Sequence, residues 1–177
     1  MNQLILLSGI PASGKSMYGK WLATNRGHIY WDLENETLEQ ASDRVNLYLG
    51  TDHNLDSLIE AITNLTRVVI IDWGFPPDTS LNTVKLLKDK GAELWWFDGD
   101  RKAAEISFLK RGKIPQDALK VQMEKIRIFW PEILRLFKGH IIKTVTRGPK
   151  YMSPQAIYEI MFANSTEAAS NKKRPQG

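Results

Sequence analysis

One short segment of the sequence has the residue types and spacing of a phosphate-binding loop. Residues 9–16 read Gly-Ile-Pro-Ala-Ser-Gly-Lys-Ser and fit the pattern G-x-x-x-x-G-K-[ST]. Glycines at both ends let the backbone curl until successive N–H groups point inward, at the positive end of the helix that follows. The segment therefore predicts a nucleotide site, with phosphate contacts from Gly9, Pro11, Ala12, Ser13, Gly14, Lys15, Ser16 and Met17.

Two side chains of this loop carry the expected chemistry. Lys15 would bridge the β- and γ-phosphates of a nucleoside triphosphate and stabilise charge during transfer, and the Ser16 hydroxyl would ligate Mg²⁺. The alternative is a tight glycine turn with an exposed lysine. Because the motif follows an apolar run and opens a helical pattern, we favour the phosphate-binding interpretation.

Two carboxylates end apolar runs elsewhere in the chain. Asp72 follows Val68–Ile71, and Asp32 follows His28–Trp31. In a doubly wound sheet the carboxyl ends of the strands face the ligand crevice. We therefore predict that Asp72 holds Mg²⁺, directly or through water, and that Asp32 takes the proton of an acceptor hydroxyl. Either could instead be a turn residue, and Glu34 is the alternative base.

A basic segment follows the fourth apolar run. Residues 101–127 hold eight basic and three acidic side chains. Arg101 and Arg111 flank a short helical pattern with Gly112 behind it, an arrangement typical of a lid that brings guanidinium groups onto transferring phosphates. The other interpretation is a solvated helix face.

The elements that position these groups alternate along the chain. Apolar runs of strand length lie at Leu4–Leu7, His28–Trp31, Val68–Ile71, Glu93–Phe97 and His140–Val145. Helical patterns lie at Lys15–Thr24, Glu36–Tyr48, Leu55–Leu65, Ser80–Lys90, Lys102–Lys110, Gln116–Phe137 and Pro154–Phe162. Pro131 should kink or split the sixth pattern. This order predicts an α/β three-layer fold, a parallel sheet with helices on both faces.

Length and composition bound the remaining possibilities. A chain of 177 residues favours one domain, here 1–163 with a lid near 99–115, followed by a disordered basic tail over 164–177. The chain has no cysteine, and its three histidines lack metal-ligand spacing, which excludes thiolate chemistry and disfavours zinc. Neither a signal peptide nor a membrane span is expected, so the predicted location is cytoplasmic.

Charge also bears on the acceptor. Residues 32–60 carry eight acidic side chains against Arg44 alone. Binding a polyanion takes lysine and arginine, so an acidic wall beside the crevice disfavours nucleic acid and favours a neutral or cationic small molecule.

The loop spelling G-I-P-A-S-G-K-S, the D-W-G-F that begins at Asp72 and the F-D-G-D-R…R-G-K of residues 97–113 resemble the P-loop kinase group. That group includes adenylate, gluconate and shikimate kinases, zeta-toxin-like kinases and the polynucleotide kinase domain. The resemblance implies a five-stranded sheet in the order 2-3-1-4-5, ATP as donor and Mg²⁺. It also implies that Arg147, in the loop after the last strand, packs on the adenine, unless that loop is a plain surface turn. Ala12 departs from the family pattern, which has glycine there.

These observations predict an ATP- and Mg²⁺-dependent kinase that transfers a phosphoryl group to a hydroxyl of a small-molecule acceptor. Two alternatives stay open: a polynucleotide 5′-kinase or nucleic-acid-associated protein, and a non-catalytic ATP-binding interaction module. The identity of the acceptor and the oligomeric state do not follow from the residues.

Overall fold

The computed structural model describes residues 4–33, 56, 59–60, 62, 65–111, 115–148 and 150–171; for Arg111 and residues 163–171 it describes the backbone alone. The chain alternates strands and helices in the way the apolar runs predict. Two predicted helices are not covered by this description: Glu36–Tyr48 lies wholly outside the described residues, and so does most of Leu55–Leu65.

A single sheet forms the centre of the protein. Its strands are β1 (Leu4–Gly9), β2 (Ile29–Asp32), β3 (Val69–Asp72), β4 (Glu93–Gly99), β5 (Ile141–Thr146) and β6 (Lys150–Tyr151). The first five strands pair in parallel, which confirms the predicted fold class. The predicted strand number was wrong: among the described residues the sheet has six strands in the order β2-β3-β1-β4-β5-β6, because β6 adds an antiparallel strand beside β5. A two-residue strand is too short to leave a pattern in the sequence.

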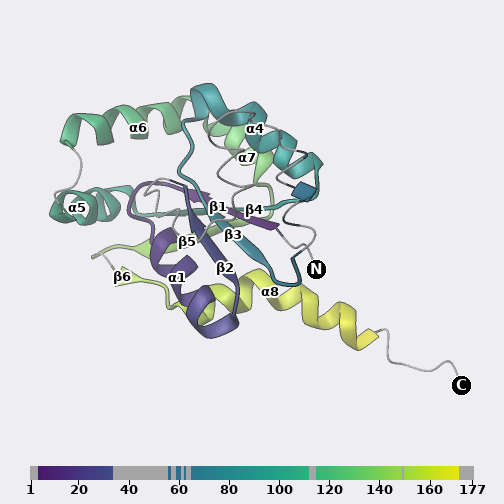
Figure 1. Cartoon of the computed structure of the whole chain (residues 1–177). Coiled ribbons are helices and arrows are strands. Elements are labelled where there is room, and N and C mark those ends of the chain that lie inside the picture. Colours follow the sequence, from purple (N-terminus) through teal and green to yellow (C-terminus); the bar gives the residue numbers. More distant parts are fainter. Residues whose placement is uncertain are drawn as a thin grey trace, which may run out of the picture.

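Helices cover both faces of the sheet, as Figure 1 shows. On one face α1 (Lys15–Arg26) and α8 (Pro154–Asn171) pack on a core that includes Ile5 and Leu7 of β1. On the other face α4 (Pro77–Asp89), α6 (Gln116–Ile128) and α7 (Trp130–Leu136) pack on a core that includes Leu4 and Leu6. Because successive side chains of β1 enter opposite cores, the strand is apolar throughout rather than alternating.

The long helical pattern from Gln116 is two helices. α6 ends at Ile128 and α7 begins at Trp130, with Pro131 in its first turn. Proline is tolerated there because the first turn of a helix has no intrahelical acceptor for its missing N–H. The split predicted from Pro131 is therefore confirmed.

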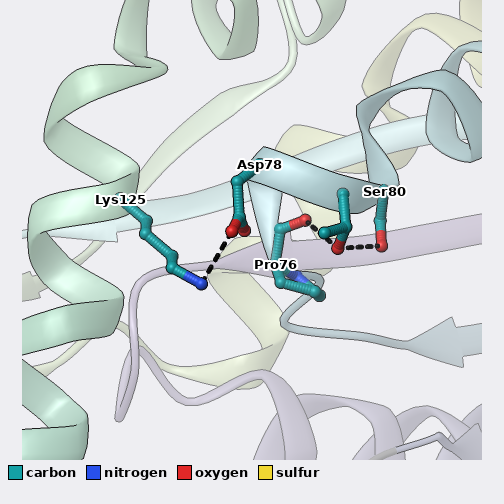
Figure 2. Close-up of polar contacts among 5 residues, drawn as sticks. Pro76, Asp78, Ser80 and Lys125 are labelled. Atoms are coloured by element: carbon teal, nitrogen blue, oxygen red, sulfur yellow. Dashed lines mark hydrogen bonds and ion pairs between the residues drawn. The ribbon is translucent and has the colours of Figure 1, made fainter.

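α6 is joined to the start of α4 by an ion pair. Lys125 Nζ lies 2.7 Å from Asp78 Oδ2, and Figure 2 shows the lysine reaching from α6 to the first turn of α4. Gln122, also on α6, donates to the Gly74 carbonyl over 3.5 Å. These contacts connect α6, the second helix of the basic segment, to the chain that leaves β3.

The C-terminal helix continues past the end of its sequence pattern. α8 runs to Asn171, beyond Ala163, after which a disordered tail is predicted, and residues 172–177 lie outside the described part. Within the described part, no helix combines the length and the apolar content needed to cross a membrane.

Candidate active site

The predicted phosphate-binding loop connects β1 to α1 in the centre of the sheet. Gly9 is the last residue of β1 and has a φ of 149°. A Cβ at this position would lie 2.2 Å from the Phe97 carbonyl oxygen of β4, so only glycine allows the strands to approach here. The loop ends at Gly14, the N-cap of α1, with a φ of 93°.

The position at which the loop departs from the family pattern also has unusual backbone geometry. Ala12 has a φ of 57°, and it is the one residue other than glycine with a positive φ in the described part. The left-handed conformation costs a residue with a Cβ about 1–2 kcal/mol. This conformation explains why glycine is usual at this position in the family pattern. In this chain Ala12 adopts the same left-handed conformation although it has a Cβ.

Two residues of the C-terminal strands hold the loop from outside. Thr144 Oγ1 donates to the Ser13 carbonyl over 2.7 Å, and Tyr151 Oη donates to the Ala12 carbonyl over 2.9 Å. Sequence reasoning missed both, because they lie more than a hundred residues from the loop and no motif marks them.

The loop and the start of α1 present groups that could bind an anion. Gly14, the N-cap of α1, has no side chain to cap the first turn, and that turn holds no acidic residue. Lys15 is buried, with Nζ 3.4 Å from the Ile10 carbonyl oxygen, and Ser13 Oγ is buried with no hydrogen-bond partner among the described residues. Uncapped N–H groups and a lysine at a helix N-terminus favour phosphate binding.

Asp72 meets the loop at the start of α1. Ser16 Oγ donates to Asp72 Oδ2 over 2.8 Å, and the Asp72 side chain is only 2% exposed. Its other oxygen, Oδ1, has no hydrogen-bond partner among the described residues. Burial raises the pKa of Asp72, while Lys15 and the hydrogen bond from Ser16 act in the opposite direction. The two residues predicted to hold a cation therefore lie in contact.

Asp32 lies beside Asp72 because β2 and β3 pair with these residues in register. Tyr30 joins them, since its hydroxyl lies 3.0 Å from Asp72 Oδ2 and 3.3 Å from Asp32 Oδ2. Burial and the charge of Asp72 raise the pKa of Tyr30 far above its ordinary value, so the phenol stays protonated and donates. The sequence analysis missed Tyr30, although the two-residue period of a strand places it on the same face as Asp32.

The arginines predicted to act in the lid and at the adenine differ in their surroundings. Arg101 begins α5 (Arg101–Arg111), and its guanidinium carbon lies 5.3 Å from the centre of the Trp130 ring on α7. Arg111 ends α5, and residues 112–114 lie outside the described part. Arg147 is 97% exposed, with Nε 3.8 Å from Oδ2 of Asp100. The lid and adenine roles of these arginines stay predictions.

The remaining predicted contacts belong to the loop and its flanks. Pro11 is buried, whereas Met17 on α1 is 45% exposed. Glu34, the alternative base, lies outside the described residues. The structure thus brings together Lys15, Ser16, Asp32 and Asp72 around the start of α1.

Searches with the sequence find no matching family model and no matching curated protein. Solved structures do match. A gluconokinase from Sinorhizobium meliloti superposes with a TM-score of 0.55 at 16% identity, covering 96% of this chain and 95% of that one. A shikimate kinase from Acinetobacter baumannii in complex with shikimate gives 0.56 at 14% identity, covering 93% and 95%.

A third structure has a bound nucleotide. The YorR protein from Bacillus subtilis in complex with phosphorylated GDP superposes with a TM-score of 0.57 at 15% identity, covering 94% of this chain and 98% of that one. The chain has the fold of the P-loop kinases.

Proposed function

We propose that the protein is an ATP- and Mg²⁺-dependent kinase that transfers the γ-phosphoryl group to a hydroxyl of a small-molecule acceptor. One observation carries the proposal. Ser16 at the start of α1 is hydrogen-bonded to Asp72 at the end of β3, and Asp72 keeps one buried oxygen without a partner among the described residues. A buried carboxylate oxygen is costly unless something binds it, and a phosphate-bound cation beside the loop would do so.

The residues fit the cation. A hydroxyl and a carboxylate oxygen are the hard ligands that Mg²⁺ takes, usually with several waters and the substrate phosphates. When bound, Mg²⁺ neutralises phosphate charge and polarises the phosphoryl oxygens. Ser16 and Asp72 would hold it.

The chain's own groups divide the remaining work. The uncapped amides of α1 and the Lys15 ammonium bind the phosphates and stabilise the charge that grows as the phosphoryl group leaves ADP. Asp32 lies beside Asp72 on the neighbouring strand. It takes the proton of the acceptor hydroxyl while the hydroxyl oxygen attacks the γ-phosphorus. Arg101 and Arg111 remain the proposed lid arginines, and Arg147 the proposed adenine contact.

The class of acceptor is proposed from two considerations. The acidic residues at 32–60 disfavour a polyanion, and the gluconokinase and shikimate kinase structures with this fold are named for small hydroxylated molecules. A small molecule with a free hydroxyl therefore fits better than an oligonucleotide.

The test is a screen for phosphoryl transfer from γ-labelled ATP to sugars, hydroxy acids, nucleosides, aminoglycosides and an oligonucleotide, with each product identified by mass spectrometry. Lys15→Met is the matched inactive control, because it keeps the length of the side chain and removes its charge. We expect transfer to a small molecule by the wild type and none above background by Lys15→Met. Equal transfer by both would refute the role of the loop, and transfer to the oligonucleotide alone would refute the proposed acceptor.

A further inference from the structure

Tyr30 occupies a position that neither the phosphate-binding motif nor the strand-end acids explain. Its hydroxyl lies within hydrogen-bond distance of carboxylate oxygens on two different strands, Asp72 Oδ2 at 3.0 Å and Asp32 Oδ2 at 3.3 Å. A phenol has one proton to donate, so the two acids share it, with the shorter contact to Asp72.

The hydroxyl determines which oxygen of Asp72 is left over. Oδ2 accepts from both Ser16 and Tyr30, and Oδ1 accepts from no described residue. Two donors on one oxygen fix the rotation of the carboxylate about its last bond. Oδ1 is thereby held in one orientation, ready for a ligand.

A second observation shows that the chain makes room for this ring. Gly19 lies in the interior of α1, where glycine costs about 1 kcal/mol relative to alanine. A Cβ at Gly19 would lie 2.1 Å from Tyr30 Cε2 and 2.3 Å from Cδ2. The helix that begins at the phosphate-binding loop therefore carries a glycine where the Tyr30 ring rests against it.

We infer that Tyr30 is a positioning residue that orients Asp72 toward the cation and ties Asp32 to the same site. The inference rests on the proposed function for the cation, and it adds a residue outside the loop motif and the two acids. Partners that orient a metal ligand typically change metal affinity or activity by about 10- to 100-fold when they are removed.

The test compares Tyr30→Phe with Tyr18→Phe. Tyr18 is a matched control, because it is fully buried on α1, next to Gly19, and its hydroxyl has no hydrogen-bond partner among the described residues. Both substitutions keep the ring and remove one oxygen. Circular dichroism and melting curves establish that each variant is folded.

The readout is binding rather than turnover. Calorimetry measures the affinity for the non-hydrolysable analogue AMP-PNP over a series of Mg²⁺ concentrations. We expect Tyr30→Phe to raise, by about 10- to 100-fold, the Mg²⁺ concentration that gives half of the Mg²⁺-dependent gain in AMP-PNP affinity. The affinity for AMP-PNP in the absence of Mg²⁺ should be unchanged. Tyr18→Phe should match the wild type on both measures.

Three results would overturn the inference: an unchanged Mg²⁺ requirement in Tyr30→Phe, an equal change in Tyr18→Phe, or a loss of affinity in Tyr30→Phe that is as large without Mg²⁺. Gly19→Ala provides a second variant, since it displaces the phenol without removing it and should shift the Mg²⁺ requirement in the same direction. Wild-type protein that binds AMP-PNP with Mg²⁺ but transfers no phosphoryl group would refute the kinase proposal and leave the role of Tyr30 standing.

Discussion

The substitution Gly19→Ala tests the packing of the site against the ordinary preference of a helix. In an unobstructed helix interior, replacing glycine by alanine stabilises by about 1 kcal/mol. In α1 the added methyl group would lie 2.1 Å from Tyr30 Cε2, closer than carbon atoms can approach, so either the ring or the helix must move. The two effects have opposite signs, and the structure predicts which one is larger.

The magnitude follows from what Tyr30 loses when it moves. Inserting a methyl group into a packed site costs about 1–3 kcal/mol. A displaced Tyr30 also weakens its hydrogen bonds to the carboxylates of Asp32 and Asp72, and a bond to a charged group is worth about 1.5–3 kcal/mol. Set against the helix preference, the net effect is a loss of about 1.5–5 kcal/mol in the free energy of unfolding.

Thermal and urea unfolding of Gly19→Ala measure this loss. In a domain of this size each kcal/mol corresponds to about 2–4 °C, so the melting midpoint should fall by at least about 3 °C. The same substitution in a Tyr30→Ala background removes the obstacle, and there Gly19→Ala should stabilise. A rise in stability in the wild-type background, or a fall of the same size in both backgrounds, would refute the reasoning.

Three further predictions concern other parts of the molecule. Asp32→Asn should lower kcat by about 10²- to 10⁴-fold while leaving ATP affinity nearly unchanged, and steady-state kinetics with unaltered kcat would remove Asp32 from the mechanism. Gly9→Ala should destabilise by about 3 kcal/mol or more, because its methyl group meets the backbone of β4 rather than a side chain, and a denaturation midpoint close to that of the wild type would contradict this. The hydrogen bond from Lys125 lowers the pKa of Asp78, so Lys125→Met should raise that pKa toward its ordinary value in an NMR titration. An acid whose pKa is lowered by folding stabilises the folded state at pH values above its ordinary pKa, and this stabilisation is lost as the pH falls. Lys125→Met removes this contribution, so the free energy of unfolding of the variant should fall less steeply with acid than that of the wild type.

The sequence was sufficient for the features that are local or periodic. β1 enters two cores, which makes it apolar throughout, and the order of such runs and helices predicts the parallel sheet. The loop motif is local because, in the proposed function, its amides and Lys15 would surround one anion. Pro131 predicts a helix boundary for an equally local reason, its missing N–H.

The features that the sequence did not predict depend on register and packing. Tyr30 reaches Asp72 because β2 and β3 pair in register and because Gly19 leaves space for the ring. Thr144 and Tyr151 reach the loop through the sheet order, which brings β5 and β6 beside it from more than a hundred residues away. No local pattern encodes such contacts. Strand alternation alone could have drawn attention to Tyr30, since it shares a face with Asp32.

These contacts lie on two different sides of the phosphate-binding loop. On the sheet side, Tyr30 and Asp72 fix the start of α1 through Ser16. On the outer side, Thr144 and Tyr151 hold the carbonyl groups of Ser13 and Ala12. A loop with the left-handed Ala12 at its centre would relax if it were held at one end only, because that conformation is unfavourable for alanine. Bonds on both sides keep the loop formed by the protein's own contacts. Under the proposed function, a nucleotide would therefore lose little affinity to ordering the loop.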